Sequence, residues 1–143
     1  MSFMHQQKHA KSAWKSSSKP TIIEKPWGHE ISWGAFNDAH GKILYIRAGE
    51  RTSYKYNVQK NEVLYLLKGK AEITFGDEYS LTDPIGHPIV TEIFEEGQTL
   101  AVQSACPYRI KAIQECEIVE IGNNKSSAVV RIADDYGRAD SSE

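Results

Sequence analysis

Residues Gly49 to Gly69 read GERTSYKYNVQKNEVLYLLKG, and this stretch decides the fold. Within it, Lys55 and Asn57 stand two residues apart, and Glu62 follows five residues after Asn57. Side chains two residues apart in a β-strand project to the same face. We therefore expect Lys55 and Asn57 to share one face of a strand, with Glu62 approaching that face from the next strand. Polar groups on an inward face form either a site or a costly burial.

Short apolar segments rich in β-branched and aromatic residues recur on both sides of this stretch. Their spacing, without a helical apolar period, predicts an all-β sandwich or barrel. We expect the segments on either side of Gly69 to pair as a β-hairpin. The expected strands are residues 43–47, 63–67, 71–75, 89–94, 99–102, 108–113, 117–121 and 129–132.

The composition is that of one globular domain. The chain has 143 residues, of which 40% are hydrophobic and 25% are charged. A chain of this size can bury a core without disulfides or metals. Because residues 1–20 are polar and without period, we expect them to form a disordered arm. The barrel is then expected over residues 21–138, followed by a polar tail over 139–143.

Charge and targeting signals exclude several classes of partner. The formal net charge of −2 gives no general attraction to nucleic acid or acidic membranes, so we expect neither as a partner. No apolar run approaches the ~20 residues that span a bilayer, and the N-terminus lacks the apolar middle of a secretory signal. Cys106 and Cys116 lack metal-binding spacing, and we expect two buried, reduced thiols. These features predict a cytoplasmic protein.

The segment from Gly49 to Gly69 resembles the first motif of the cupin superfamily. That motif reads glycine, five residues, His, one residue, His, three or four residues, Glu, six residues, glycine. This chain keeps both glycines and Glu62, with Lys55 and Asn57 at the two histidine positions. In the stretch resembling the second motif, Tyr108 stands by register where the family has a further histidine. The resemblance implies a small cupin-type barrel, also described as a double-stranded β-helix or jelly roll.

The two ends of the domain narrow the resemblance to one cupin branch. The opening Lys25–Gly28 (KPWG) and the closing Val130–Arg138 (VRIADDYGR) resemble those of the type II mannose-6-phosphate isomerase domain. That domain also occurs at the C-terminus of mannose-1-phosphate guanylyltransferases. The resemblance covers about residues 21–138. It implies a sugar phosphate or nucleotide sugar as ligand and, because cupins commonly pair, a homodimer.

The residues at the motif positions are poor metal ligands. A transition metal prefers imidazole nitrogens and carboxylates, whereas Lys55 offers an ammonium, Asn57 a neutral oxygen and Tyr108 a protonated phenol. We therefore expect no bound metal and no other cofactor. Instead we predict that the Lys55 ammonium lies near the vacated metal position and pairs with Glu62, directly or in a short polar network. The alternative is that Lys55 sits on the rim with its amine in water.

Three functions remain open. The first is an enzyme that isomerises or epimerises a sugar phosphate or nucleotide sugar by proton transfer between side chains. The second is a non-catalytic module that holds a small polar or anionic ligand. The third is a structural barrel that dimerises through its strands. The enzyme hypothesis assigns Glu62 as general base, Tyr108 or Lys55 as acid, Arg109 or Arg51 as anion contact, and Asn57 as a further substrate-binding residue.

Overall fold

The computed structural model describes residues 19–36, 38–123, 126–139 and 141–142. All regular structure in these ranges is β-strand, so the expected all-β class is confirmed. None of the described segments forms a helix long and apolar enough to cross a membrane. Most of the expected N-terminal arm lies outside the described residues, and Thr21 begins the first strand.

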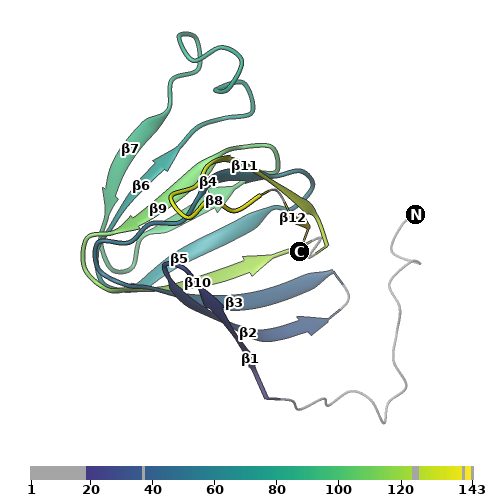
Figure 1. Cartoon of the computed structure of the whole chain (residues 1–143), viewed down its shortest axis with the longest axis vertical. Coiled ribbons are helices and arrows are strands. Elements are labelled where there is room, and N and C mark those ends of the chain that lie inside the picture. Colours follow the sequence, from purple (N-terminus) through teal and green to yellow (C-terminus); the bar gives the residue numbers. More distant parts are fainter. Residues whose placement is uncertain (1–18, 37, 124–125, 140, 143) are drawn as a thin grey trace.

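Two antiparallel six-stranded sheets lie against each other in a barrel (Figure 1). Sheet A has the order β1 (Thr21–Lys25), β2 (Gly28–Phe36), β3 (Ala39–Ile46), β10 (Cys116–Gly122), β5 (Glu62–Lys68) and β8 (Thr99–Val102). Sheet B has the order β12 (Ser141–Ser142), β11 (Ala128–Ala133), β4 (Tyr54–Asn57), β9 (Tyr108–Ala112), β6 (Ala71–Phe75) and β7 (Val90–Phe94). The short strand β12 lies in the segment that we expected to be a polar tail.

The expected hairpin around Gly69 is wrong. Strand β5 pairs with β10 and β8 in sheet A, whereas β6 pairs with β7 and β9 in sheet B. The chain turns a corner between the sheets at Gly69, which has φ +96°. A Cβ at this position would lie 2.1 Å from the carbonyl oxygen of Glu115. Only glycine fits this turn, which lets both strands face one core instead of pairing with each other.

Alternation along the strands separates the barrel interior into an apolar and a polar part. Strand β5 turns Glu62, Leu64 and Leu66 inward and leaves Val63 and Tyr65 exposed. Strands β9 and β10 likewise bury several apolar side chains and one polar side chain each. The buried core cluster contains Leu44, Ile46, Leu64, Leu66, Ile73, Phe94, Ile110 and Ile118, among others. The polar inward residues lie at one end of these same strands.

The C-terminal segment after β11 docks onto the barrel. Two N–H groups of Arg51 donate to the two carboxylate oxygens of Asp135, at 2.5 and 2.8 Å. Tyr136 donates its hydroxyl hydrogen to Glu50, and Arg138 pairs with Asp134 at 2.9 Å. These contacts hold the turn that follows β11 against the residues that precede β4.

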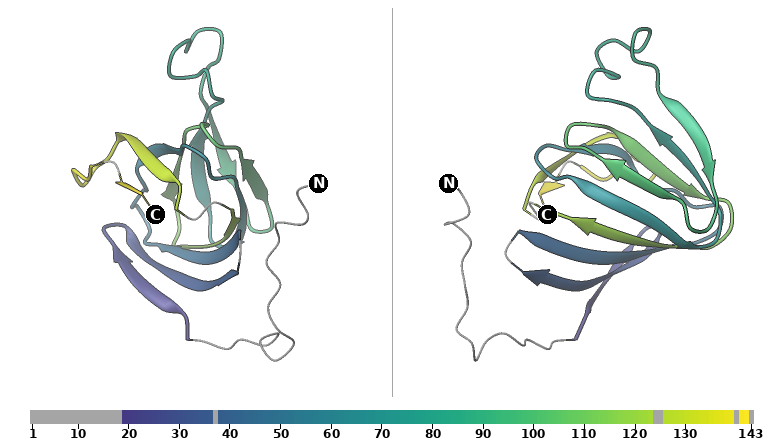
Figure 2. Two further views of the ribbon diagram at one scale, coloured as in Figure 1. Left: turned by 90° about the vertical axis from the view of Figure 1, so that its right-hand side faces the viewer. Right: turned by 180° about the vertical axis from the view of Figure 1, so that it is seen from behind.

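A long loop between β6 and β7 projects from one end of the barrel (Figures 1 and 2). Asp77 organises it by accepting a hydrogen bond from the Tyr79 backbone N–H and pairing with His87 at 2.7 Å. Ile85 at its tip is 93% exposed. The loop lies apart from the buried polar residues described below.

Candidate functional site

Glu62 is the centre of a buried hydrogen-bond network. The Asn57 side-chain amide donates to Glu62 Oε1 at 2.9 Å, and the Tyr108 hydroxyl donates to the same oxygen at 3.0 Å. These three residues come from β4, β5 and β9, and each is buried. Asn57 and Tyr108 are thus direct neighbours of Glu62, whereas the partner that we expected for Glu62 in this network was Lys55.

The lysine that pairs with Glu62 is Lys60, not Lys55. The Lys60 ammonium lies 3.5 Å from Glu62 Oε2 and 3.4 Å from Glu120 Oε2. The side chains of Lys60 and Glu62 are each 2% exposed. Sequence reasoning missed Lys60 because it precedes β5 in the turn, outside the motif positions. Strand alternation does not apply at this position, so the sequence contains no periodic signal for Lys60.

Glu120 on β10 completes a pair of buried carboxyl groups. It is hydrogen-bonded to Glu62, and burial together with the Glu62 charge raises the pKa of Glu120 to about 7. Burial alone would raise the pKa of Glu62, but the hydrogen bond from Glu120 and the charges of Lys60 and Lys55 lower it. The two carboxyl groups thus share one proton, held mainly by Glu120. The inward alternation of Ile118 and Glu120 in the expected strand 117–121 could have identified this residue.

Lys55 lies on β4 in the wall of the interior, directly opposite Tyr108 on β9 and Arg131 on β11. It is half-buried, and its charge lowers the pKa of Glu62. Within the part of the chain that the structure describes, its ammonium forms no ion pair shorter than 4 Å. Lys55 thus belongs to the same polar interior as Glu62 but does not form the direct ion pair that was one of our expectations.

A second ion cluster lies on the strands of sheet A. The Glu30 carboxylate on β2 forms ion pairs with two ammonium groups, that of Lys42 on β3 at 3.4 Å and that of Lys25 on β1 at 3.7 Å. Lys42 lies directly opposite Glu120 in the register of β3 and β10, and its charge acts on that carboxyl group. Two lysines therefore contact one carboxylate beside the shared-proton pair.

Arg51 and Arg109, which we expected as anion contacts, both pair with Asp135 of the C-terminal segment. Arg51 forms the two-contact ion pair described above, and Arg109 lies 3.6 Å from the same carboxylate. Arg109 also donates to the backbone carbonyls of Thr52 and Ala133. The structure does not bring these two arginines to Glu62. The arginines that reach the interior are Arg131 and Arg138.

An enclosed cavity of about 30 Å³ lies among these charged side chains. Six of the residues that line it are lysine or arginine, and two are glutamate. The side chains of Lys25 and Arg138 are 24% and 23% exposed, against 7% for Lys42 and 2% for Lys60. The charged lining residues are Lys25, Lys42, Lys55, Lys60, Arg131, Arg138, Glu30 and Glu120.

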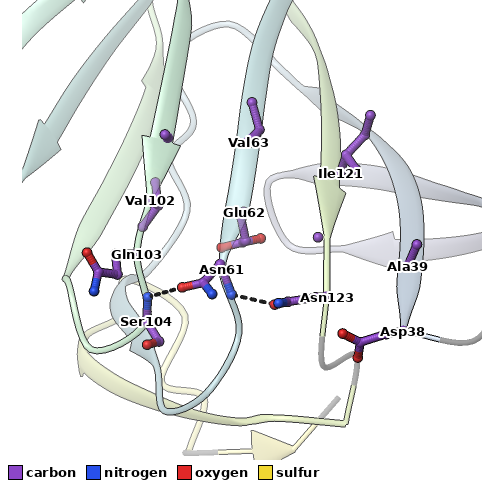
Figure 3. A pocket seen from close by; sticks show the side chains of 12 residues that line it. Asp38, Ala39, Asn61, Glu62, Val63, Val102, Gln103, Ser104, Ile121 and Asn123 are labelled. Atoms are coloured by element: carbon purple, nitrogen blue, oxygen red, sulfur yellow. Dashed lines mark hydrogen bonds between the residues drawn. The ribbon is translucent and has the colours of Figure 1, made fainter. Parts of the chain in front are cut away.

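A larger, open groove of about 770 Å³ lies at the start of β5 (Figure 3). Asn61 anchors its wall, because its side-chain oxygen accepts from the Ser104 backbone and its backbone N–H donates to the Asn123 side chain. The only charged residues that line it within the described ranges are Asp38 and Glu62. Glu62 therefore borders this groove and also contacts the residues that line the enclosed cavity.

The donor set around Glu62 does not fit a transition metal. Its carboxylate accepts hydrogen bonds from an amide and a phenol and pairs with an ammonium group. The neighbouring carboxyl group of Glu120 has a pKa raised to about 7. Across the described ranges, no three His, Cys, Asp or Glu side chains are grouped so that they could hold a metal ion. A cation at this place would have to displace Lys60. The expectation that the barrel works without a metal stays a prediction, and the chemistry of these donors supports it.

The paired antiparallel sheets around a polar interior are the cupin fold, which confirms the expected cupin-type barrel. Oxalate decarboxylase from Bacillus subtilis superposes with a TM-score of 0.66 at 14% identity, over 79% of this chain and 30% of that chain. KdgF from Halomonas sp. superposes with a TM-score of 0.59 at 8% identity, over 72% of this chain and 86% of that one. CapF superposes with a TM-score of 0.60 at 15% identity, over 84% of this chain and 32% of that one.

These likenesses show the fold alone. The chain spans about a third or less of the length of oxalate decarboxylase and CapF. No protein-family model matches the sequence, and no curated protein matches it. Another structure of the Bacillus subtilis decarboxylase was studied for its Mn(II) centres. The side chains around Glu62 in this chain do not offer the ligands that a transition metal prefers.

Proposed function

We propose that this barrel binds a small anionic ligand in its interior. The observation that carries the proposal is the enclosed cavity, which six cationic side chains and two glutamates line. A charge removed from water persists only where an opposite charge or a hydrogen bond compensates it. Among these cations, Lys55 has no carboxylate within 4 Å in the described part of the chain, although it lines the cavity. An anion in the cavity would place a negative charge beside it.

The ligand that we favour is a phosphorylated sugar, that is, a sugar phosphate or nucleotide sugar. Lysine and arginine side chains are the usual protein contacts of phosphate groups. The opening KPWG and closing VRIADDYGR segments, which resemble those of mannose-6-phosphate isomerase domains, support the sugar part of this proposal. The Asn57 side-chain oxygen is buried and has no hydrogen-bond partner among the described residues. It is an acceptor that a ligand hydroxyl or a water can satisfy.

Thermal stability tests the binding proposal. A ligand present at 100 times its Kd stabilises the folded state by about 2.7 kcal/mol. We expect sugar phosphates or nucleotide sugars to raise the Tm, and the matching sugars without phosphate to raise it less. The proposal fails if none of the phosphorylated compounds raises the Tm and titration calorimetry detects no heat of binding.

A second candidate function is isomerisation or epimerisation of the bound sugar. It is favoured by the carboxyl pair, because Glu62 is ionised, Glu120 holds a proton with a pKa near neutrality, and Glu62 borders the open groove. Glu62 would remove a proton from a carbon beside a carbonyl group, and Glu120, Tyr108 or Lys55 would give a proton to the carbonyl oxygen. An acid with a pKa near the working pH is suited to this task.

Exchange of substrate hydrogen with solvent deuterium tests the catalytic candidate. We expect exchange at the carbon next to the carbonyl group of a bound sugar phosphate, and we expect Glu62→Gln and Glu120→Gln to abolish it. Glu117→Gln is the matched control, because Glu117 lies on the same strand as Glu120 with an outward-facing position in the alternation. Retained exchange in the Glu62→Gln variant would remove Glu62 as the base.

We further infer that two copies associate through the outer face of sheet A. Ile43, Val119 and Tyr65 lie side by side on β3, β10 and β5, and Ile121 and Val63 continue the same face. Val63, Tyr65 and Ile121 are 51%, 41% and 52% exposed. Because this row carries no charge, two identical copies can stack on it without like-charge repulsion. We also place the protein in the cytoplasm, a prediction that the free thiols of Cys106 and Cys116 support.

A further inference from the structure

Three interior side chains stand in one row across sheet B. In the strand register, Arg131 of β11 lies directly opposite Lys55 of β4, and Lys55 lies directly opposite Tyr108 of β9. All three line the enclosed cavity. Two like charges directly opposite each other on antiparallel strands destabilise a sheet. Inside a barrel, where water screens less, the cost is larger than on a surface.

The neighbouring carboxylates do not form an ion pair with the Lys55 ammonium. The closest carboxylates of the interior are engaged by other lysines: Glu62 by Lys60 at 3.5 Å, and Glu30 by Lys42 at 3.4 Å. Asp134 is engaged by Arg138. Lys55 thus faces another cation across the strands and has no carboxylate within 4 Å in the described part of the chain.

We propose that one tetrahedral oxyanion with two negative charges, the phosphate of a monoester, binds in the cavity and bridges Lys55 and Arg131. This inference rests on the proposed anion-binding function and narrows its ligand class. A cavity of about 30 Å³ holds roughly two water molecules, or one small oxyanion in their place. It has no room for a sugar ring or for the two phosphates of a nucleoside diphosphate, so a phosphate that enters it must be the terminal group of a ligand whose remainder lies outside. The phosphate of a monoester is terminal, whereas the diphosphate of a nucleotide sugar lies between its nucleoside and its sugar. The structure therefore favours a sugar monophosphate over a nucleotide sugar.

The bridge makes sulfate binding depend on Lys55. Lys55→Met removes one of the two bridging cations, so sulfate should bind at least tenfold more weakly. Sulfate is the probe because it stays a dianion across the working pH range. A merely structural lysine would leave sulfate binding unchanged when replaced.

Lys111→Met is the matched control, because Lys111 lies on the neighbouring strand β9 and is exposed. We expect it to bind sulfate as the unchanged protein does. Lys55→Arg keeps the charge and should keep sulfate binding, which provides a test if Lys55→Met does not fold. A nucleotide sugar should give no stabilisation through this site.

The outcomes separate the bridge from the proposed function. Equal sulfate affinity in the Lys55→Met and Lys111→Met variants overturns the bridge. If sugar phosphates still bind Lys55→Met unchanged, the proposed function stands without the bridge. If neither sulfate nor any sugar phosphate binds the unchanged protein, the proposed function fails and the bridge fails with it.

Discussion

The Lys60 ammonium lies 3.5 Å from one oxygen of Glu62, and both side chains are almost completely buried. Lys60 also contacts Glu120, so a single ammonium serves both carboxyl groups of the interior. Removal of one partner of a buried ion pair leaves an uncompensated charge, which typically costs about 3–5 kcal/mol. We expect Lys60→Met to lower the free energy of unfolding by this amount in urea titration.

Lys68→Met is the control for that experiment, because Lys68 ends the same strand β5 and is exposed. We expect it to change the stability by less than about 0.5 kcal/mol. Adding Glu120→Gln to Lys60→Met should recover part of the lost stability, because it removes one of the two carboxyl groups that lose their ammonium. A Lys60→Met variant as stable as Lys68→Met would show that this ion pair is not what balances the interior.

Glu120 should make the stability depend on pH. Its pKa is raised from 4.5 to about 7 in the folded protein, mainly by burial. A carboxyl group with a raised pKa contributes stability below its unfolded pKa and loses it as the pH rises through the folded value. We therefore expect the free energy of unfolding to fall between about pH 4.5 and pH 7, and Glu120→Gln to flatten that slope.

Glu62 acts on stability in a different pH range. Its pKa is lowered from 4.5, so its contribution is lost as the pH falls below that value. In the Glu120→Gln variant, the free energy of unfolding should still fall below pH 4.5 but should no longer depend on pH between 4.5 and 7. Denaturant titrations at several pH values measure both, and an unchanged slope between pH 4.5 and 7 in Glu120→Gln would contradict the assignment.

Gly69→Ala should destabilise the barrel far more than Gly97→Ala. Both glycines have positive φ, +96° and +89°, but only at Gly69 would a Cβ meet backbone, 2.1 Å from the Glu115 oxygen. Strain and overpacking together should cost Gly69→Ala about 3 kcal/mol, against about 1 kcal/mol for Gly97→Ala. Denaturant titration of both variants checks the difference, and equal losses would show that the corner tolerates a side chain.

The Arg51–Asp135 pair should contribute little to stability. Its side chains are 42% and 39% exposed, and exposed ion pairs contribute little to stability. We expect Asp135→Asn to lower the free energy of unfolding only slightly. The loss should shrink in high salt, because salt screens exposed charges. A loss that salt leaves unchanged would indicate that Arg109, which is less exposed and also contacts Asp135, dominates.

Val63→Lys should separate two copies of the chain without unfolding the barrel. Val63 points outward from β5 and is half-exposed, so a lysine there is compatible with the fold but not with an apolar interface. Ile93→Lys, at a 48% exposed position of β7 in the other sheet, is the control. Sedimentation analysis should show a dimer for the control and a monomer for Val63→Lys. A monomer for the unchanged protein would rule out the dimer.

The sequence predicted three members of the Glu62 network, Asn57, Glu62 and Tyr108, but neither Glu120 nor Lys60. The resemblance to the cupin motifs marked those three positions, and strand alternation explains why they share the interior. Lys60 lies in a turn, where no such periodicity applies. Long side chains add a second difficulty, since the reach of Lys55 and Lys60 is set by rotamers and not by strand register.

Pairing between distant strands was the other part that local patterns did not determine. Two apolar runs around Gly69 are compatible with a hairpin or with a corner between sheets. The choice depends on the approach of Glu115, which is distant in sequence. The same holds for Arg51 and Arg109, whose partner Asp135 is supplied by the far end of the chain.

Strands β5, β9 and β10 each carry one polar inward residue and at least two apolar ones. The scaffold and the chemistry are therefore encoded at different positions of the same strands. Substitutions at Glu62 or Glu120 leave the apolar positions that hold the two sheets together untouched, whereas Tyr108 belongs to both parts, because it lies in the core cluster and its hydroxyl contacts Glu62. Such an arrangement allows the polar side chains of the interior to change, for example from metal ligands to charged groups that line a cavity, while the apolar core and the fold stay the same.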